Sequence, residues 1–130
     1  MFKTPHELSN FQLESLARKN RIPLIAVLSK DMLYHYRFRN GNYIINLQSS
    51  KAGSGTHWVA LSVREKGPSK YFDSYGLPPP TDITRYVSPH HVDFNTIRIQ
   101  GLESQSCGWF ALFALKELEQ NKTFQIGRAH

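Results

Sequence analysis

The sequence has 130 residues, 40% of them hydrophobic, with sixteen Lys and Arg, ten Asp and Glu, six His and one Cys. This length favours one domain, and the hydrophobic content argues against intrinsic disorder. A single Cys excludes an intramolecular disulfide framework and a thiolate-cluster zinc site. No apolar stretch approaches the ~20 residues of a membrane span, and residues 1–9 lack the apolar segment of a secretory signal. We therefore expect a protein of a reducing compartment that is neither secreted nor membrane-bound.

The positive charge is concentrated in the N-terminal part of the chain. Residues 1–51 contain eight basic and three acidic side chains, whereas residues 52–130 contain eight and seven. A basic flank of this kind is compatible with nucleic acid or an acidic partner. An ordinary solvated surface is the commoner explanation, since no RNA-binding or helix-turn-helix signature accompanies the charge.

The first half of the sequence predicts one helix and two strands. A capping box at Ser9–Gln12 begins a helix that we expect to end at Asn20. The short apolar run 22–28 predicts a buried strand. Residues 43–47 follow an Asn-Gly turn signal and predict a second strand, ahead of a Gly- and Ser-containing loop at 51–56.

The second half predicts a hairpin, a further strand and two helices. Residues 57–65 and 70–74 are rich in β-forming residues and flank a Lys-Gly-Pro-Ser turn. A short helix is expected at 81–87 after three consecutive prolines, and a strand at 93–99. Residues 107–120 predict a helix that is apolar around nearly its whole circumference in its first turns, so we expect it to lie inside the domain.

These elements predict an α+β fold with a mixed, mainly antiparallel sheet packed against the buried helix. No repeat or linker indicates a second domain, so we assign residues 1–124 to a single domain. Residues 125–130 read QIGRAH, which is the translation of a common sequencing-adapter run, CAG ATC GGA AGA GCA CAC. We expect this segment to be a non-native tail without function, so His130 is not a candidate ligand.

Cys107 is the candidate nucleophile because it stands at the predicted start of the buried helix. The unpaired N–H groups and the dipole of a helix N-terminus favour a thiolate over a thiol. Gly108 removes side-chain bulk beside the sulfur and leaves room for a substrate carbonyl. Taken alone, however, a lone Cys is more often a buried apolar residue than a nucleophile.

A nucleophilic cysteine needs a base, and the base needs a partner that orients it. His57 begins one arm of the predicted hairpin and Asp73 lies near the end of the other, so antiparallel pairing can bring the two together. The remaining histidines lie near the termini, in a polar aromatic stretch, or adjacent to each other. None shows a metal-ligand spacing with another His or Cys, so we expect no metal site.

Acyl transfer by cysteine also needs hydrogen-bond donors for the developing oxyanion. The backbone N–H of Cys107 is one candidate. A side-chain amide upstream is another, from either Gln100 or Gln105, and spacing alone does not choose between them.

Three groups of residues occur in an order that resembles a known family: Gly55–Trp58, Tyr71–Pro80, and Gln100 followed by Ser106–Trp109. The pattern resembles the adenovirus-type maturation cysteine proteases, especially those of Maverick/Polinton elements and related double-stranded DNA viruses. These enzymes are similar in turn to the SUMO- and ubiquitin-like-protein proteases. The resemblance covers residues 8–118 and implies their papain-type fold, with the nucleophilic cysteine at the N-terminus of the buried helix.

The resemblance implies a role for each candidate. His57 is the expected general base, Asp73 its orienting partner and Cys107 the nucleophile. Gln100 is favoured over Gln105 as the oxyanion donor, because the adenovirus-type glutamine stands seven residues before the cysteine. The adenovirus enzymes have Glu at the position of Asp73, and either carboxylate can orient an imidazole.

Three further residues are expected to contact substrate. Trp58 matches an aromatic residue that helps to form a narrow substrate tunnel in the SUMO proteases, although core packing explains it equally well. Asn46 falls where the adenovirus-type enzyme has a substrate-contacting asparagine. Gly108 completes this set as the small neighbour of the nucleophile.

The function implied by the resemblance is that of a cysteine endopeptidase which cleaves viral or transposon capsid and core precursor proteins. Cleavage is expected after Gly in Gly-Gly or Gly-X-Gly contexts, by a monomer that needs no cofactor for its chemistry. The host cell nucleus or cytoplasm and the virion are the expected locations. Adenovirus proteases are activated by a peptide joined through a second Cys, which this sequence lacks, and are stimulated by DNA, for which the basic N-terminal half is the candidate surface.

Three alternatives remain open. The first is a protease of SUMO- or ubiquitin-like tails. The second is an acetyltransferase, although no additional cofactor-binding segment is visible in the sequence. The third is an inactive DNA- or capsid-binding module, against which the complete set of candidate catalytic residues argues.

Overall fold

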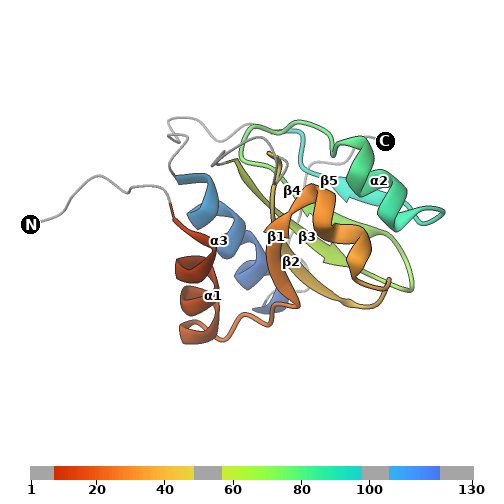
Figure 1. The fold of residues 1–130 in the computed structure, drawn as a ribbon. Coiled ribbons are helices and arrows are strands. Elements are labelled where there is room, and N and C mark those ends of the chain that lie inside the picture. The colour runs from red at the N-terminus through yellow and green to blue at the C-terminus, as the bar shows by residue number, and fades with distance from the viewer. Residues whose placement is uncertain (1–7, 49–56, 98–105, 121–130) are drawn as a thin grey trace, which may run out of the picture.

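The computed structural model describes residues 8–48, 57–97 and 106–120 (Figure 1). Five strands form one mixed sheet in the order β1-β2-β3-β4-β5, so neighbours in the sheet are also neighbours in sequence. The elements are α1 (Asn10–Lys19), β1 (Ala26–Ser29), the short 3₁₀-helix η1 (Lys30–His35), β2 (Gly41–Asn46), β3 (Trp58–Val63), β4 (Ser69–Phe72), α2 (Thr81–Val87), β5 (Val92–Phe94) and α3 (Cys107–Gln120).

The sheet lies between two helical layers. Figure 1 shows α1 and α3 on one face, and η1 and α2 on the other. Alternate residues of the central strands point into two separate core clusters: Ile44, Ala60 and Phe72 pack with α1 and α3, whereas Tyr43 and Leu61 pack with η1 and α2. Because both faces are covered, all six residues of β3 are buried.

The two central strand pairings are antiparallel and the two outer pairings are parallel. The predicted hairpin corresponds to β3 and β4, and its turn contains Gly67 in the left-handed region (φ 79°). The α+β class and the mixed sheet are confirmed. The parallel pairings of β1 and β5 result from crossovers through η1 and α2, which reverse the chain before it rejoins the sheet.

The predicted helices agree closely with the structure. Ser9 caps α1, its Oγ accepts the Gln12 N–H, and the Gln12 side chain accepts the Ser9 N–H, so the capping box is complete. The bounds of α2 and α3 equal those expected. The helix η1 has no counterpart in the sequence analysis.

Four predicted strands are shorter in the structure than expected, those at 22–28, 57–65, 70–74 and 93–99. Residues 22–25 do not belong to β1, because Ile22 N–H bonds to the Ala17 carbonyl and closes the end of α1, and Pro23 has no N–H to contribute to a ladder. The strand expected at 93–99 ends at Phe94, and the last two residues of that range lie outside the described residues. The predicted loop at 51–56 and the predicted tail at 125–130 lie outside them as well.

The expectation that α3 is buried all round is wrong. One face, with Ala111 and Leu115, packs on the sheet and on α1, while Trp109 and Phe113 are 43% and 59% exposed. These two residues are one helical turn apart and share the outer face of α3. The sheet and α1 together cover only one side of a helix whose apolar residues extend around it.

Candidate active site

The predicted catalytic residues lie together where β3 begins, β4 ends and α3 begins. His57 directly precedes β3, Asp73 directly follows β4, and Cys107 is the first residue of α3. Because β3 and β4 are antiparallel, the start of one lies beside the end of the other. The helix α3 packs across β3, so its N-terminus reaches the same place.

His57 and Asp73 form a short hydrogen bond. The distance from His57 Nε2 to Asp73 Oδ1 is 2.7 Å. The Asp73 side chain is 1% exposed and the His57 side chain 24%. The carboxylate is therefore sealed inside the domain, whereas the imidazole reaches solvent on one side.

Cys107 is buried and lies beside the imidazole. It hydrogen bonds to His57, and because Nε2 is engaged by Asp73, Nδ1 is the nitrogen left for the sulfur. The backbone N–H of Trp58 also donates to Cys107 Sγ at 3.2 Å. This N–H donor and the helix N-terminus both favour negative charge on the sulfur.

The environment of His57 favours its protonated form. Burial alone would lower its pKa, but the hydrogen bonds to Asp73 and Cys107 and the negative charge of both groups raise the pKa from 6.5 to about 9. These contacts therefore favour the imidazolium form of the ring near neutral pH. An imidazolium next to a cysteine sulfur stabilises the thiolate, which is the nucleophilic form.

Two residues that the sequence analysis did not assign to the site contact this pair. The Tyr75 ring stacks on His57, with ring centroids 4.7 Å apart and planes 13° from parallel. The Asn95 side chain bonds to both backbone groups of Asp73, at 2.7 and 2.6 Å. Tyr75 stands two residues after Asp73 and was visible in the family pattern, but no local signal marks Asn95.

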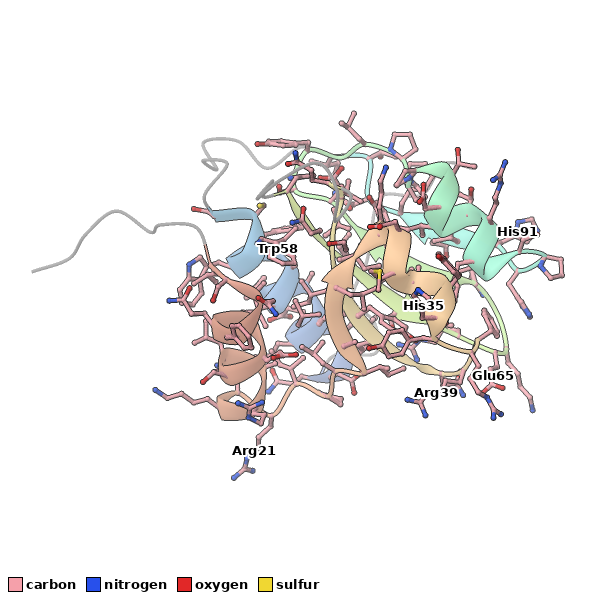
Figure 2. All side chains as sticks on the ribbon, in the orientation of Figure 1. Arg21, His35, Arg39, Trp58, Glu65 and His91 are labelled. Atoms are coloured by element: carbon pink, nitrogen blue, oxygen red, sulfur yellow. The ribbon has the colours of Figure 1, made fainter. Side chains whose placement is uncertain are left out.

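Trp58 and Asn46, which are expected to contact substrate, lie near the site but in different environments. Trp58 is buried in the core between the sheet and α3, and its Nε1 donates to the Leu8 carbonyl at 3.1 Å (Figure 2). Core packing therefore accounts for its side chain. Asn46 pairs with Trp58 in the β2–β3 register, and its Oδ1 accepts the Gln48 N–H at 3.0 Å. Substrate contacts by both residues stay predictions.

Gly108 faces the interior of the domain. A Cβ added there would stand 3.3 Å from both Leu13 Cδ2 and Trp58 Cδ1, and 3.5 Å from Leu8 Cδ1. The missing side chain thus serves the packing of α3 on β3 and α1, rather than opening space in front of the sulfur. A contact between the Gly108 backbone and a substrate stays a prediction.

Gln100 and Gln105, the two candidate oxyanion donors, lie outside the described residues. Within residues 8–48, 57–97 and 106–120, no three His, Cys, Asp or Glu side chains are grouped as a metal site would require. Over the same ranges, no helix has the length and apolar character that crossing a membrane demands.

The fold is similar to that of a viral protease of known structure. Two crystal structures of the ASFV pS273R protease, one containing selenomethionine, superpose with TM-scores of 0.60 and 0.58 at 21% and 20% sequence identity. The matches cover 91% of this chain in both cases, and 59% and 60% of the ASFV chain, so this chain spans about three fifths of that protein's length. No family model and no curated protein matches the sequence. The likeness shows the fold alone: this chain has the α+β, papain-type fold of that protease.

Proposed function

We propose that this protein is a viral cysteine endopeptidase of the adenovirus type, related to the Maverick/Polinton proteases. The observation that carries the proposal is the position of His57, which bonds to buried Asp73 through Nε2 and to Cys107 at the N-terminus of α3. A nucleophile, a base and an orienting carboxylate in this relation are the elements of acyl transfer by a thiol. The fold shared with the ASFV protease supports the same conclusion.

The first half of the reaction forms an acyl-enzyme. The Cys107 thiolate attacks the peptide carbonyl carbon, and the carbonyl oxygen takes up the negative charge. Collapse of this intermediate breaks the C–N bond, while the His57 imidazolium gives its Nδ1 proton to the leaving amine. Asp73 holds the ring in place throughout and keeps the proton on Nε2.

The second half releases the acyl group. Neutral His57 takes a proton from water, the resulting hydroxide attacks the thioester, and the C–S bond breaks to restore thiolate and imidazolium. Gln100 and the backbone N–H of Cys107 are the proposed oxyanion donors in both halves. This chemistry requires no metal or organic cofactor.

The proposed substrates are capsid or core precursor proteins, cleaved after Gly in Gly-Gly or Gly-X-Gly sequences. A monomer acting in the host nucleus or cytoplasm and in the virion fits this function, with DNA or a peptide as candidate activator. The first alternative is a protease of SUMO- or ubiquitin-like tails, and the third is an inactive DNA- or capsid-binding module.

The decisive experiment is a peptide-library cleavage profile of the wild-type protein, with and without DNA, beside Cys107→Ala and His57→Ala. Both variants should lose cleavage by roughly a thousandfold or more, since members of a catalytic triad act as a unit. His90→Ala is the matched control. His90 also stacks on an aromatic ring, that of Phe38, and within the described residues no contact joins it to His57, Asp73 or Cys107, so this variant should cleave like the wild type.

The outcomes separate the candidate functions. Cleavage by Cys107→Ala at the wild-type rate would contradict the proposal. Preference for ubiquitin-like tails over Gly-X-Gly peptides would support the first alternative. A Cys107 that does not react with a thiol-directed peptide probe, combined with salt-sensitive DNA binding, would support the inactive module.

A further inference from the structure

Asn95 is a buried amide that the mechanism above does not use. Its Oδ1 accepts the Asp73 backbone N–H at 2.7 Å, and its Nδ2 donates to the Asp73 carbonyl at 2.6 Å and to the Ile97 carbonyl at 3.2 Å. An amide side chain has one acceptor and two donors to offer. Asn95 thus engages both backbone groups of Asp73, whose carboxylate bonds to His57.

The end of the β4–β5 pairing explains why a side chain, rather than a neighbouring strand, bonds to the Asp73 backbone. The parallel strands β4 and β5 pair only as far as Tyr71 and Phe94. Beyond that point the β4–β5 ladder supplies no partner for the Asp73 N–H, and a buried N–H without a partner is costly; the Asp73 carbonyl also accepts the Gly76 N–H at 2.8 Å. The Asn95 side chain continues the hydrogen bonding past the last strand pair and thereby fixes the backbone from which the Asp73 carboxylate projects.

The carboxylate depends on that backbone because its own contacts are short and directional. Asp73 Oδ1 accepts both His57 Nε2 at 2.7 Å and the Tyr75 N–H at 3.0 Å. An Asp side chain has two rotatable bonds, so a shift of its backbone moves Oδ1 relative to the imidazole. A displacement on the order of 1 Å in a catalytic group can reduce the rate about a hundredfold.

We propose that Asn95 is a positioning residue, which holds Asp73 so that its carboxylate keeps the His57 ring oriented toward Cys107. This inference rests on the proposed cysteine protease function. Asn95 does not touch the reacting atoms; it acts through the Asp73 backbone.

The chain offers a matched control in Asn42. This residue is also a buried Asn with side-chain bonds to a backbone carbonyl and a carboxylate, those of Pro23 and Glu119, both at 3.0 Å. It lies near the opposite end of β2 from Asn46, the end that adjoins the site. Loss of either amide removes two side-chain hydrogen bonds or more from the core, but only Asn95 is tied to Asp73.

The experiment compares Asn95→Ala and Asn95→Ser with Asn42→Ala and Asn42→Ser in the full chain. Steady-state kinetics on a cleaved peptide separate kcat from KM, and NMR titration of the His57 ring gives its protonation midpoint without any substrate. Both Asn95 variants should lower kcat about 10- to 100-fold with little change in KM. They should also move the His57 midpoint down, because the hydrogen bond to Asp73 raises the pKa of His57. Both Asn42 variants should leave kcat and the midpoint near their wild-type values.

The serine variants retain a polar atom and provide a folded protein if the alanine variant is too unstable to assay. A folded Asn95 variant with the wild-type kcat and His57 midpoint would overturn the inference. So would equal losses in the Asn42 variants, which would mark the effect as one of general stability. If the wild-type protein cleaved no peptide, the proposed protease function would fail, while the titration would still test whether Asn95 positions Asp73.

Discussion

His57 contacts both of the other ionisable groups of the proposed triad, Asp73 and Cys107. It lies between a sealed carboxylate, a buried thiol and the face of Tyr75, and only part of its ring reaches solvent. Burial alone disfavours the imidazolium, and the two hydrogen-bonded partners more than offset that cost. The unfolded chain lacks these partners. The rise of the His57 pKa from 6.5 to about 9 therefore means that protonation of His57 stabilises the folded state.

We predict that the contribution of His57 to the free energy of unfolding falls as the pH rises from 6.5 to 9. The thiolate proposed at Cys107 offsets this fall below about pH 8.5, where the thiol of the unfolded chain keeps its proton. A raised pKa in the folded state stabilises the protein fully below the unfolded value of 6.5, and this contribution is lost as the pH passes the folded value of about 9. The contribution amounts to about 3 kcal/mol at most, and less in practice because one side of the ring is solvated. Urea denaturation at a series of pH values measures it.

His57→Gln is the control for this pH dependence, since Gln does not titrate. The scan ends at pH 9 because ordinary tyrosines ionise near 10.0, and the buried Tyr71 and Tyr86 have raised pKa values that add their own pH dependence above that point. An equal decline in the wild-type protein and in His57→Gln would show that His57 is not its source.

At the scale of elements, the turn after β4 and the segment after β5 support each other. Gly76 adopts φ 69° and lies so close to the second segment that an added Cβ would stand 2.9 Å from the Thr96 carbonyl oxygen and 3.0 Å from the carbonyl carbon of Ile97. Its N–H bonds to the Asp73 carbonyl at 2.8 Å, the same oxygen that Asn95 contacts. The two segments together hold the Asp73 backbone in place through hydrogen bonds to its carbonyl oxygen.

We predict that Gly76→Ala is clearly more destabilising than Gly67→Ala. Both glycines have left-handed backbone, which costs an alanine about 1 to 2 kcal/mol. A Cβ at Gly67 meets nothing within 4 Å, whereas at Gly76 it meets backbone that must move. Gly76→Ala should also reduce peptide cleavage, because the movement reaches Asp73.

The two substitutions are compared by urea denaturation and by kcat. Gly67→Ala, in the exposed turn between β3 and β4, should lose stability alone and keep its kcat. Equal destabilisation of the two variants would contradict the close packing of the turn against residues 96–97.

The whole molecule carries a formal charge of +6, and its exposed basic side chains lie in more than one region. Figure 2 shows Arg21 below α1, and Arg39 on the side of η1 and α2. Arg39 belongs to a segment, residues 34–39, in which aromatic and basic side chains alternate; Tyr34 and Tyr36 are exposed, whereas Phe38 is partly buried. Alternating aromatic and basic residues are suited to single-stranded nucleic acid, since bases stack on the rings while cations contact phosphates.

We predict that DNA binding, proposed above as a means of activation, depends on Arg37 and Arg39. The double variant Arg37→Glu/Arg39→Glu should weaken binding of a single-stranded oligonucleotide and reduce the slope of log affinity against log salt by about two. Fluorescence anisotropy at several salt concentrations measures both quantities. Arg18→Glu/Lys19→Glu makes the same change in net charge at the end of α1, and an equal effect of both pairs would show that total charge, not this segment, governs binding.

The sequence by itself determined the parts of this protein that depend on neighbouring residues. The capping box at Ser9, the bounds of α2 and α3, and the hairpin of β3 and β4 all follow from caps, breakers and periodicity within a few residues. The same reasoning, with the family resemblance, selected His57, Asp73 and Cys107. The hairpin juxtaposes His57 and Asp73, and the packing of α3 on β3 brings Cys107 to them. The catalytic roles themselves stay predictions.

Only the tertiary structure decided the features that depend on distant segments. The parallel pairing of β1 and β5, the exposed face of α3 and the contacts of Asn95 with Asp73 each join parts of the chain whose proximity no local pattern encodes. Asn95 illustrates the physical reason: an Asn after a strand is common, and its importance arises only because the β4–β5 ladder ends at Tyr71 and the Asp73 N–H bonds to the Asn95 side chain instead. Local propensity therefore specifies the helices and strands. The contacts that hold Asp73 in place depend instead on how β5 pairs with β4 in the folded sheet.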